Sequence, residues 1–109
     1  MNFRDFLKNN IVRLDGGLGT LLQSKGLKAG EYPERWNISH PDVIRDIHKA
    51  YYDAGSNVVC TNTFGANCLK FDKTELEAIV SAAISNVKAY VLKSKSNNLI
   101  YGNITVFVC

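Results

Sequence analysis

The chain has 109 residues, of which 46% are hydrophobic and 21% are charged, so its composition predicts one globular domain of ordinary size. The net charge of +3 is small and basic residues do not alternate with stacking aromatics, which argues against a nucleic-acid partner. No apolar run approaches the roughly 18 residues of a membrane-spanning helix, and the N-terminus lacks the apolar centre of a signal peptide. We therefore expect a cytoplasmic protein with no membrane partner.

The cysteines are odd in number, and no two of them have C-x-x-C spacing. This pattern argues against a disulfide framework and against a zinc site built from this chain alone. We expect three reduced thiols, with the first packed in a strand: Cys60, Cys68 and Cys109.

The first part of the chain predicts a short amphipathic lead at residues 2–8 and then a strand at residues 11–14. A helix is expected over residues 18–24, and the glycines that follow it are expected to end it. Residues 27–38 have no clear period and contain Gly30 and Pro33, so this segment is predicted to be a loop, with Trp36 packing it onto the wall of the domain.

A clear amphipathic helix is predicted next. Ser39 is the expected N-cap, with Asp42 in the first turn, and Gly55 is expected to end the helix. A strand then follows at residues 57–60. The residues expected on the apolar face recur at helical spacing: Val43, Ile44, Ile47, Ala50, Tyr51 and Ala54.

A second long helix is predicted to begin at a capping box made by Thr74 and Glu77 and to end near Lys95. Residues 97–98 make the turn into a last strand within residues 99–109, most apolar at 104–108. The expected buried stripe of this helix consists of Leu76, Ile79, Val80, Ala83, Ile84, Val87 and Val91.

The resulting order is β–α–β–α–β, which predicts an α/β fold with a parallel sheet, because helices between strands imply crossover connections. The chain ends in or just after an apolar strand, and a parallel strand needs cover on both faces. We therefore expect a parallel βαβαβ segment that forms the opening part of a larger barrel.

The first candidate site follows the first strand, where Asp15 precedes Gly16 and Gly17. A carboxylate at a strand end can hold an ammonium group, and adjacent glycines bring backbone N–H groups close enough to hold a carboxylate. Together they could bind both ends of an α-amino acid. A tight turn shaped by glycine is the competing interpretation, and the spacing alone favours it. The sequence does not match the phosphate-binding patterns G-x-G-x-x-G and Gly-Lys-Ser/Thr.

The second candidate site, Thr61, Asn62 and Thr63, follows the second predicted strand. Two hydroxyls and an amide suit an uncharged polar contact with a substrate. A local network in which they satisfy the backbone of their own loop is the competing interpretation, and the residue types alone favour it. Two polar strand ends in succession favour a shared rim, because the carboxyl ends of parallel strands meet at one edge. His40 and His48 have no partners at metal-ligand spacing and are expected to be exposed or capping.

Taken together and in this order, several motifs resemble the homocysteine S-methyltransferase family. Within it, the likeness is greatest to the homocysteine-binding domain at the N-terminus of cobalamin-dependent methionine synthases. The motifs are residues 14–20, residues 33–37, residues 41–44, His48, Tyr51, residues 54–56 and residues 61–66.

The resemblance implies that residues 1–109 are the N-terminal part of a homocysteine-binding (β/α)8 TIM barrel, supplying three of its eight strands. It implies that Asp15 lies near the substrate amino group with Gly16 and Gly17 beside it, and that Thr61, Asn62 and Thr63 line the same mouth. It also implies a zinc ion that acidifies the homocysteine thiol and is held by cysteines from late strands. The three cysteines of this chain do not match those ligands, so no catalytic or metal residue is expected here.

The expected function is therefore that of an N-terminal fragment of a zinc-dependent enzyme that transfers a methyl group to homocysteine and makes methionine. Methylcobalamin is a possible donor, and cobalamin and folate domains are possible partners in the full-length protein. We expect the isolated chain to be inactive and to self-associate. Two alternatives stay open: a non-catalytic α/β module that binds a ligand or assembles, and a different barrel enzyme that uses the Asp15 loop.

Overall fold

The computed structural model describes residues 3–93 and 103–104. Helices dominate this part of the chain, and the strands are short. The elements in chain order are α1 (Phe3–Asn9), α2 (Gly19–Ser24), the 3-10 helix η1 (Pro33–Arg35), α3 (Trp36–Ser39), α4 (Pro41–Asp53), β1 (Val59–Cys60), α5 (Lys73–Lys93) and β2 (Asn103–Ile104).

The strands pair in parallel, with β1 in the middle. Cys60 of β1 lies opposite Ile104 of β2, and on the other side Leu14 forms a parallel bridge with Val58. The strand predicted at residues 11–14 is thus reduced to its last residue. The predicted βαβαβ unit of full strands is not confirmed by the described residues, and most of the apolar stretch at 104–108 lies outside them.

The entry to the sheet explains part of this shortening. The Asn57 side-chain oxygen accepts a hydrogen bond from the Arg13 backbone N–H at 2.9 Å, and the Asn57 N–H donates to the Arg13 carbonyl at 2.8 Å. A side chain therefore replaces one backbone partner, so a regular ladder begins only after residue 57.

Helix α4 confirms the predicted amphipathic helix but differs at its start. His40, not Ser39, is the N-cap residue, and it makes no side-chain capping bond. The Ser39 hydroxyl instead donates to the Arg35 carbonyl at 3.2 Å, so it stays with the preceding turn. This turn belongs to α3, which with η1 replaces the second half of the loop predicted at residues 27–38, whereas residues 27–32 contain no helix or strand.

The end of α4 follows the prediction. Gly55 has a φ of 111°, its N–H donates to the Tyr52 carbonyl, and the Ser56 N–H donates to the Tyr51 carbonyl. This is a Schellman ending, which requires a residue that tolerates a left-handed backbone. Glycine at position 55 therefore ends the helix and turns the chain into β1.

The buried face of α4 is shifted from the predicted one. Ile44 and Ile47 are buried as expected, but Ala50 and Ala54 are exposed. The face is completed by His48 and Tyr52, which follow Ile44 at four-residue intervals and are buried. The shift arises because α4 packs against both α3 and α5, and the larger side chains fill that space.

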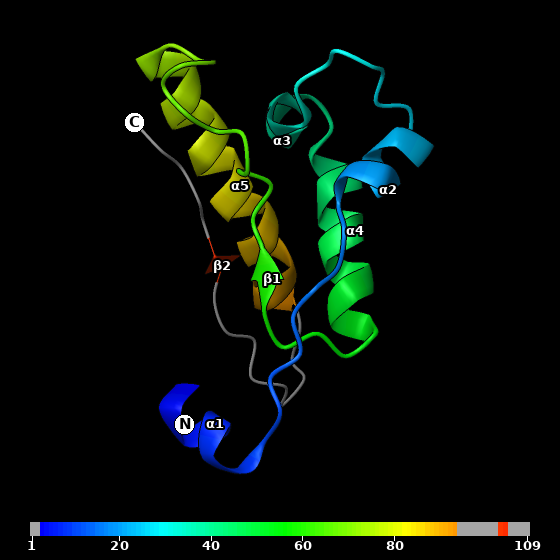
Figure 1. The fold of residues 1–109 in the computed structure, drawn as a ribbon, viewed down its shortest axis with the longest axis vertical. Coiled ribbons are helices and arrows are strands. Elements are labelled where there is room, and N and C mark those ends of the chain that lie inside the picture. The colour runs from blue at the N-terminus through cyan, green and yellow to red at the C-terminus, as the bar shows by residue number, and fades with distance from the viewer. Residues whose placement is uncertain (1–2, 94–102, 105–109) are drawn as a thin grey trace.

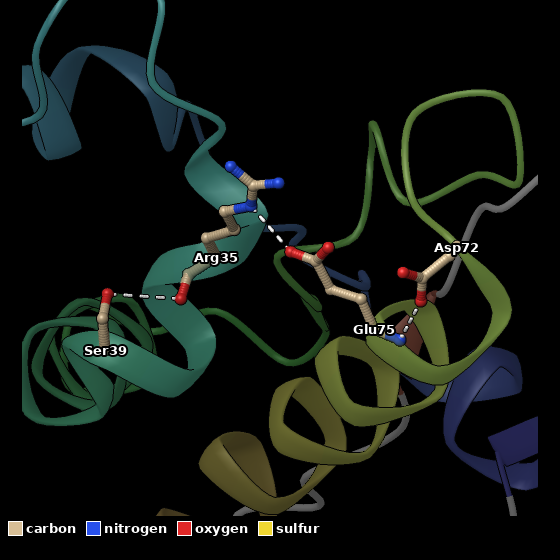
Figure 2. A network of polar contacts seen from close by, with 4 residues as sticks. All are labelled: Arg35, Ser39, Asp72 and Glu75. Atoms are coloured by element: carbon tan, nitrogen blue, oxygen red, sulfur yellow. Dashed lines mark hydrogen bonds and ion pairs between the residues drawn. The ribbon is translucent and has the colours of Figure 1, made fainter.

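Helix α5 begins two residues earlier than the sequence suggested. The Asp72 carboxylate accepts a hydrogen bond from the Glu75 N–H at 2.8 Å, so Asp72 is the N-cap and Thr74 is exposed inside the first turn. Glu75 binds the Arg35 Nε at 2.7 Å. Figure 2 shows this contact bridging the segment before α3 to the start of α5.

The predicted stripe of α5 is confirmed at Ile79, Ala83 and Val87, which are buried. Leu76, Val80 and Ile84 are half-buried. The side chain of Val91 lies outside the part that the structure describes. Asn86 also lies in the stripe and is buried, although its polarity predicts exposure.

The core is divided among small clusters around the helices. Trp36 packs with Leu22, Ile44 and Ile47, which confirms that it anchors the segment before α4. Val59 of β1 packs with Tyr52 of α4 and with α5. In the described part of the chain, none of the helices is both long and apolar enough to cross a bilayer.

Figure 1 shows α4 and α5 side by side behind the strands, both running opposite to β1. The segment after Leu14 and the loop after β1 both emerge at the end of the molecule where α4 and α5 begin, whereas α1 lies at the other end. Two loops from successive strand ends therefore share one edge, as the sequence predicted.

Candidate functional site

Asp15 is held at the end of its strand by backbone and side-chain bonds to β1. Its N–H donates to the Val58 carbonyl at 3.1 Å, and its Oδ2 accepts from the Cys60 N–H at 3.0 Å. The Cys60 thiol also hydrogen-bonds the Asp15 carboxylate. The side chain is half-buried, and its contacts with Cys60 brace the sheet.

The two glycines after Asp15 lie against Tyr51 of α4. The Tyr51 hydroxyl donates to the Gly17 carbonyl, and a Cβ added to Gly16 would lie only 3.0 Å from the Tyr51 hydroxyl oxygen. Close approach of the tyrosine, rather than a left-handed backbone, is therefore what requires glycine at position 16. Both glycines are exposed on their other side.

His48 is buried beneath this turn, contrary to the exposed or capping position expected for it. Only 1% of its surface is exposed, and neither ring nitrogen has a hydrogen-bond partner within the described part of the chain. Burial lowers the pKa of His48 to about 4, although the negative charge of Asp15 opposes this shift. The ring is therefore neutral at pH 7. The other histidine, His40, is exposed as expected.

Cys60 lies between the two predicted motifs. Its N–H binds Asp15, and Thr61 follows it directly, so the structure brings Asp15 and the Thr61–Thr63 loop to one strand edge. Burial raises the pKa of the Cys60 thiol, and the Asp15 charge raises it further. The thiol is protonated at neutral pH, so it is a packing group here rather than a nucleophile.

The loop after β1 is folded tightly on itself. The Thr61 and Thr63 hydroxyls lie 2.7 Å apart, and the Thr63 N–H donates to the Thr61 carbonyl at 2.8 Å. Both side chains are buried. These contacts match the interpretation in which the hydroxyls satisfy their own loop.

Asn62 points into the protein, toward α3. Its side-chain amide donates to the Pro33 carbonyl at 2.8 Å and to the Asn37 Oδ1 at 3.0 Å. Asn37 returns a bond to the Asn62 carbonyl at 2.9 Å, and Asn86 of α5 donates to the Asn37 carbonyl at 3.1 Å. This chain of buried amides joins the second loop to α3 and α5. Asn62 therefore supports the loop from inside the protein, whereas Asp15 contacts β1 at the strand edge.

A buried carboxylate that the sequence analysis did not name as a site residue lies between η1 and the loop after β1. Glu34 of η1 is only 4% exposed, and burial raises its pKa while Lys70 opposes the shift. A Cβ added to Gly65 would lie 2.5 Å from the Glu34 Oε1 and 3.0 Å from the Lys70 Nζ. Gly65 therefore lets the segment before α3 and the loop after β1 pack closely.

Two surface hollows lie elsewhere on the described chain. One is formed by residues of η1, α3 and the preceding turn, and the other by one face of α5; neither includes Asp15 or Thr61. Among the described residues, no three His, Cys, Asp or Glu side chains are grouped so as to hold a metal ion. These residues therefore do not supply a zinc site.

Comparison with known proteins identifies the family. The model of the homocysteine S-methyltransferase family matches residues 12–107, which is most of the chain. The chain belongs to the homocysteine S-methyltransferase family. Both loops at the strand edge, with Asp15 and Thr61, lie inside the matched stretch.

Curated relatives in this family include two named methionine synthase. The protein from Mycobacterium tuberculosis is 38% identical over 69 residues, covering 58% of this chain and 6% of the relative. The one from Mycobacterium leprae is 41% identical over 67 residues, covering 56% and 6%. The aligned part is thus a small fraction of each of these relatives.

The fold agrees with solved members of the family. The homocysteine methyltransferase MmuM from Escherichia coli in its metallated form superposes with a TM-score of 0.70 at 20% identity, covering 95% of this chain and 39% of MmuM. Its apo form gives 0.64 at 24%, covering 84% and 34%. At this identity the comparison concerns fold, and the chain spans well under half of the solved protein.

Two residues important to the site geometry, His48 and Tyr51, were not predicted as site residues. His48 carried a usable signal, because it lies four residues from both Ile44 and Tyr52 and so continues one buried helical stripe. Nothing in the sequence around Tyr51 indicates that its hydroxyl reaches a turn 34 residues earlier in the chain.

Proposed function

We propose that residues 1–109 form the N-terminal part of a homocysteine-binding (β/α)8 barrel in an enzyme that methylates homocysteine to methionine. Membership of the family supports methyl transfer to homocysteine as the reaction class. The curated relatives support the methionine synthase type, and the likeness to MmuM supports the fold.

The observation that carries the proposal is the position of Asp15 at its strand end. Its Oδ2 accepts the Cys60 N–H, and the half-buried carboxylate lies at the same strand edge as the loop of Thr61 and Thr63, so we expect it to accept the substrate ammonium group. A charge-assisted hydrogen bond of this kind contributes roughly 1.5–3 kcal/mol. The Gly16 and Gly17 N–H groups have no acceptor in the described chain, and they would bind the substrate carboxylate.

Thr61 and Thr63 would form the second wall of this amino-acid subsite. Their hydroxyls pair with one another, which fixes the shape of that wall. Asn62 would act indirectly, because its amide is committed to Pro33 and Asn37. It would hold the loop in place.

In the methyl transfer itself, the homocysteine sulfur forms a bond to the methyl carbon as the bond between that carbon and the donor breaks, and the thiol proton is lost. The family resemblance implies that zinc, held by cysteines from later strands, makes this sulfur nucleophilic. Since the described residues do not fit zinc, their part is to bind and orient the amino-acid end. Methylcobalamin is a candidate donor, and cobalamin and folate domains are candidate partners.

The test uses the full-length protein that carries this segment. It should form methionine from homocysteine and a methyl donor and should retain zinc after dialysis, whereas the chain of residues 1–109 should do neither. The measurements are methionine formed with methylcobalamin and metal content by elemental analysis. Stoichiometric zinc or methionine formation in the isolated chain would contradict the assignment of the metal site to other strands.

A further inference from the structure

One tyrosine of α4 contacts both glycines of the turn that follows Asp15. The Tyr51 hydroxyl donates to the Gly17 carbonyl. The same ring lies against Gly16, where an added Cβ would be 3.0 Å from the hydroxyl oxygen and 3.3 Å from Cε1. The group that contacts this turn comes from α4 and not from the loop itself. The shape of the turn therefore depends on a residue 34 positions away in the chain.

The direction of one amide follows from this hydrogen bond. The peptide unit is planar and trans, so the Gly17 carbonyl and the Leu18 N–H point in opposite directions. With the carbonyl drawn toward Tyr51, the Leu18 N–H faces away from α4. Among the described residues, this N–H has no acceptor, as is also true of the Gly17 N–H. Successive backbone N–H groups of a turn that point the same way favour an anionic group.

We propose that Tyr51 is a positioning residue that orients the backbone N–H groups around Gly17 toward the carboxylate of the amino-acid substrate. The inference rests on the proposed function, in which Asp15 binds the ammonium end and the glycine turn binds the carboxylate end. What it adds is that Tyr51 sets the direction of the N–H groups in that turn. Tyr51 acts through the backbone and does not itself touch the substrate.

The experiment measures binding in the full-length protein with three ligands: homocysteine, its analogue without the amino group, and its analogue without the carboxylate. Tyr51→Phe removes the hydroxyl but keeps the ring against Gly16. The dissociation constant should rise about three- to tenfold for homocysteine and for the desamino analogue, the change expected for one lost hydrogen bond. It should stay unchanged for the decarboxy analogue.

Tyr32→Phe is the matched control. Tyr32 lies before η1, its ring packs against Phe71, and it makes no contact with the glycine turn. This variant should leave all three dissociation constants unchanged. Gly16→Ala disrupts the same hydrogen bond, from Tyr51 to the Gly17 carbonyl, without changing Tyr51, since its new methyl group would displace the tyrosine. It should reproduce the selective loss even if Tyr51→Phe folds poorly.

The outcomes separate the inference from the proposed function. An equal loss of affinity for all three ligands, or no loss for any, would overturn the positioning role of Tyr51 while leaving the proposed function intact, provided that the unmodified protein binds homocysteine. Failure of the unmodified protein to bind homocysteine would overturn both.

Discussion

At the level of single residues, Asp15 combines a structural bond with a proposed binding role. Its Oδ2 accepts the Cys60 N–H at 3.0 Å, and its negative charge is proposed to bind the substrate ammonium group. A substitution that keeps the first and weakens the second can tell the two roles apart.

Asp15→Asn is that substitution, tested in the full-length protein. The amide oxygen can still accept the Cys60 N–H, so the melting temperature should change little. Loss of the negative charge should weaken homocysteine binding by about ten- to a hundredfold, because the bond to the ammonium group is no longer charge-assisted. Calorimetric titration with homocysteine and thermal unfolding measure the two effects.

The control is Asp46→Asn, which removes an exposed carboxylate of α4 and should change neither quantity. Normal homocysteine affinity together with a large fall in melting temperature for Asp15→Asn would mean that Asp15 only braces the turn.

His48 should make stability depend on pH. Its pKa falls from 6.5 to about 4 in the folded protein because it is buried, so the unfolded state binds more protons between these values and stability rises with pH there. The contribution is fully present above pH 6.5 and is lost as the pH falls toward 4, with a size on the order of 3 kcal/mol.

His48→Gln removes the titrating group and should flatten this dependence, whereas His40→Gln, at an exposed site, should retain it. Denaturant unfolding of the full-length protein and both variants at several pH values between 4 and 7 gives the comparison. An identical pH slope in the His48 variant would show that other groups cause the acid sensitivity.

At the level of elements, the loops of the candidate site are held by the starts of helices. Asp72 caps α5, and Glu75 in the same first turn binds Arg35, as Figure 2 shows. Asn37 of α3 connects Asn62 to α5 through Asn86. The position of the second loop therefore depends on α5 beginning at the correct residue.

Asp72→Ala should destabilise the protein by about 1 kcal/mol, the usual effect of losing an N-cap side chain. Thr74→Ala is a sharp control, because the sequence pattern places the cap at Thr74 while the structure leaves Thr74 exposed; it should change stability by less than about 0.5 kcal/mol. Chemical denaturation of the two variants decides between the sites. A larger effect at Thr74 would restore the predicted capping box.

At the level of the whole molecule, the chain exposes apolar side chains that a complete barrel would cover. Ile11 is 83% exposed and Leu14 is 60% exposed along the first strand segment, which pairs with β1 on one side. Phe64 and Leu69 in the loop after β1 are exposed by 92% and 94%. An unpaired strand edge beside such side chains is prone to self-association.

The isolated chain should therefore form concentration-dependent oligomers. Leu14→Glu places a charge at the exposed edge and should reduce association, whereas Ile38→Glu, at a 51% exposed site on α3, should not. Sedimentation velocity over a range of concentrations measures this. A monodisperse, cooperatively unfolding monomer would contradict the open barrel and favour a complete small domain, and a defined oligomer insensitive to Leu14→Glu would favour an assembly module.

The sequence by itself located helices α4 and α5 and the two loops of the candidate site, but it did not predict η1 or α3. The helical spacing of apolar residues located both α4 and α5, and the glycine after α4 located its end. These are local features of the chain. The joint order of motifs also identified the family, which the family match confirms. The roles of Asp15, Gly16, Gly17, Thr61, Asn62 and Thr63 in binding a substrate stay predictions.

Only the tertiary structure decided how those residues are supported. The burial of His48, the reach of Tyr51 to Gly17 and the commitment of Asn62 to Asn37 each join segments at least 25 residues apart. The shortening of the first strand was also decided there, since the Asn57 side chain replaces a backbone partner of Arg13. Local sequence patterns describe which face of a helix is apolar, but long-range packing chooses the partner that each polar group finds.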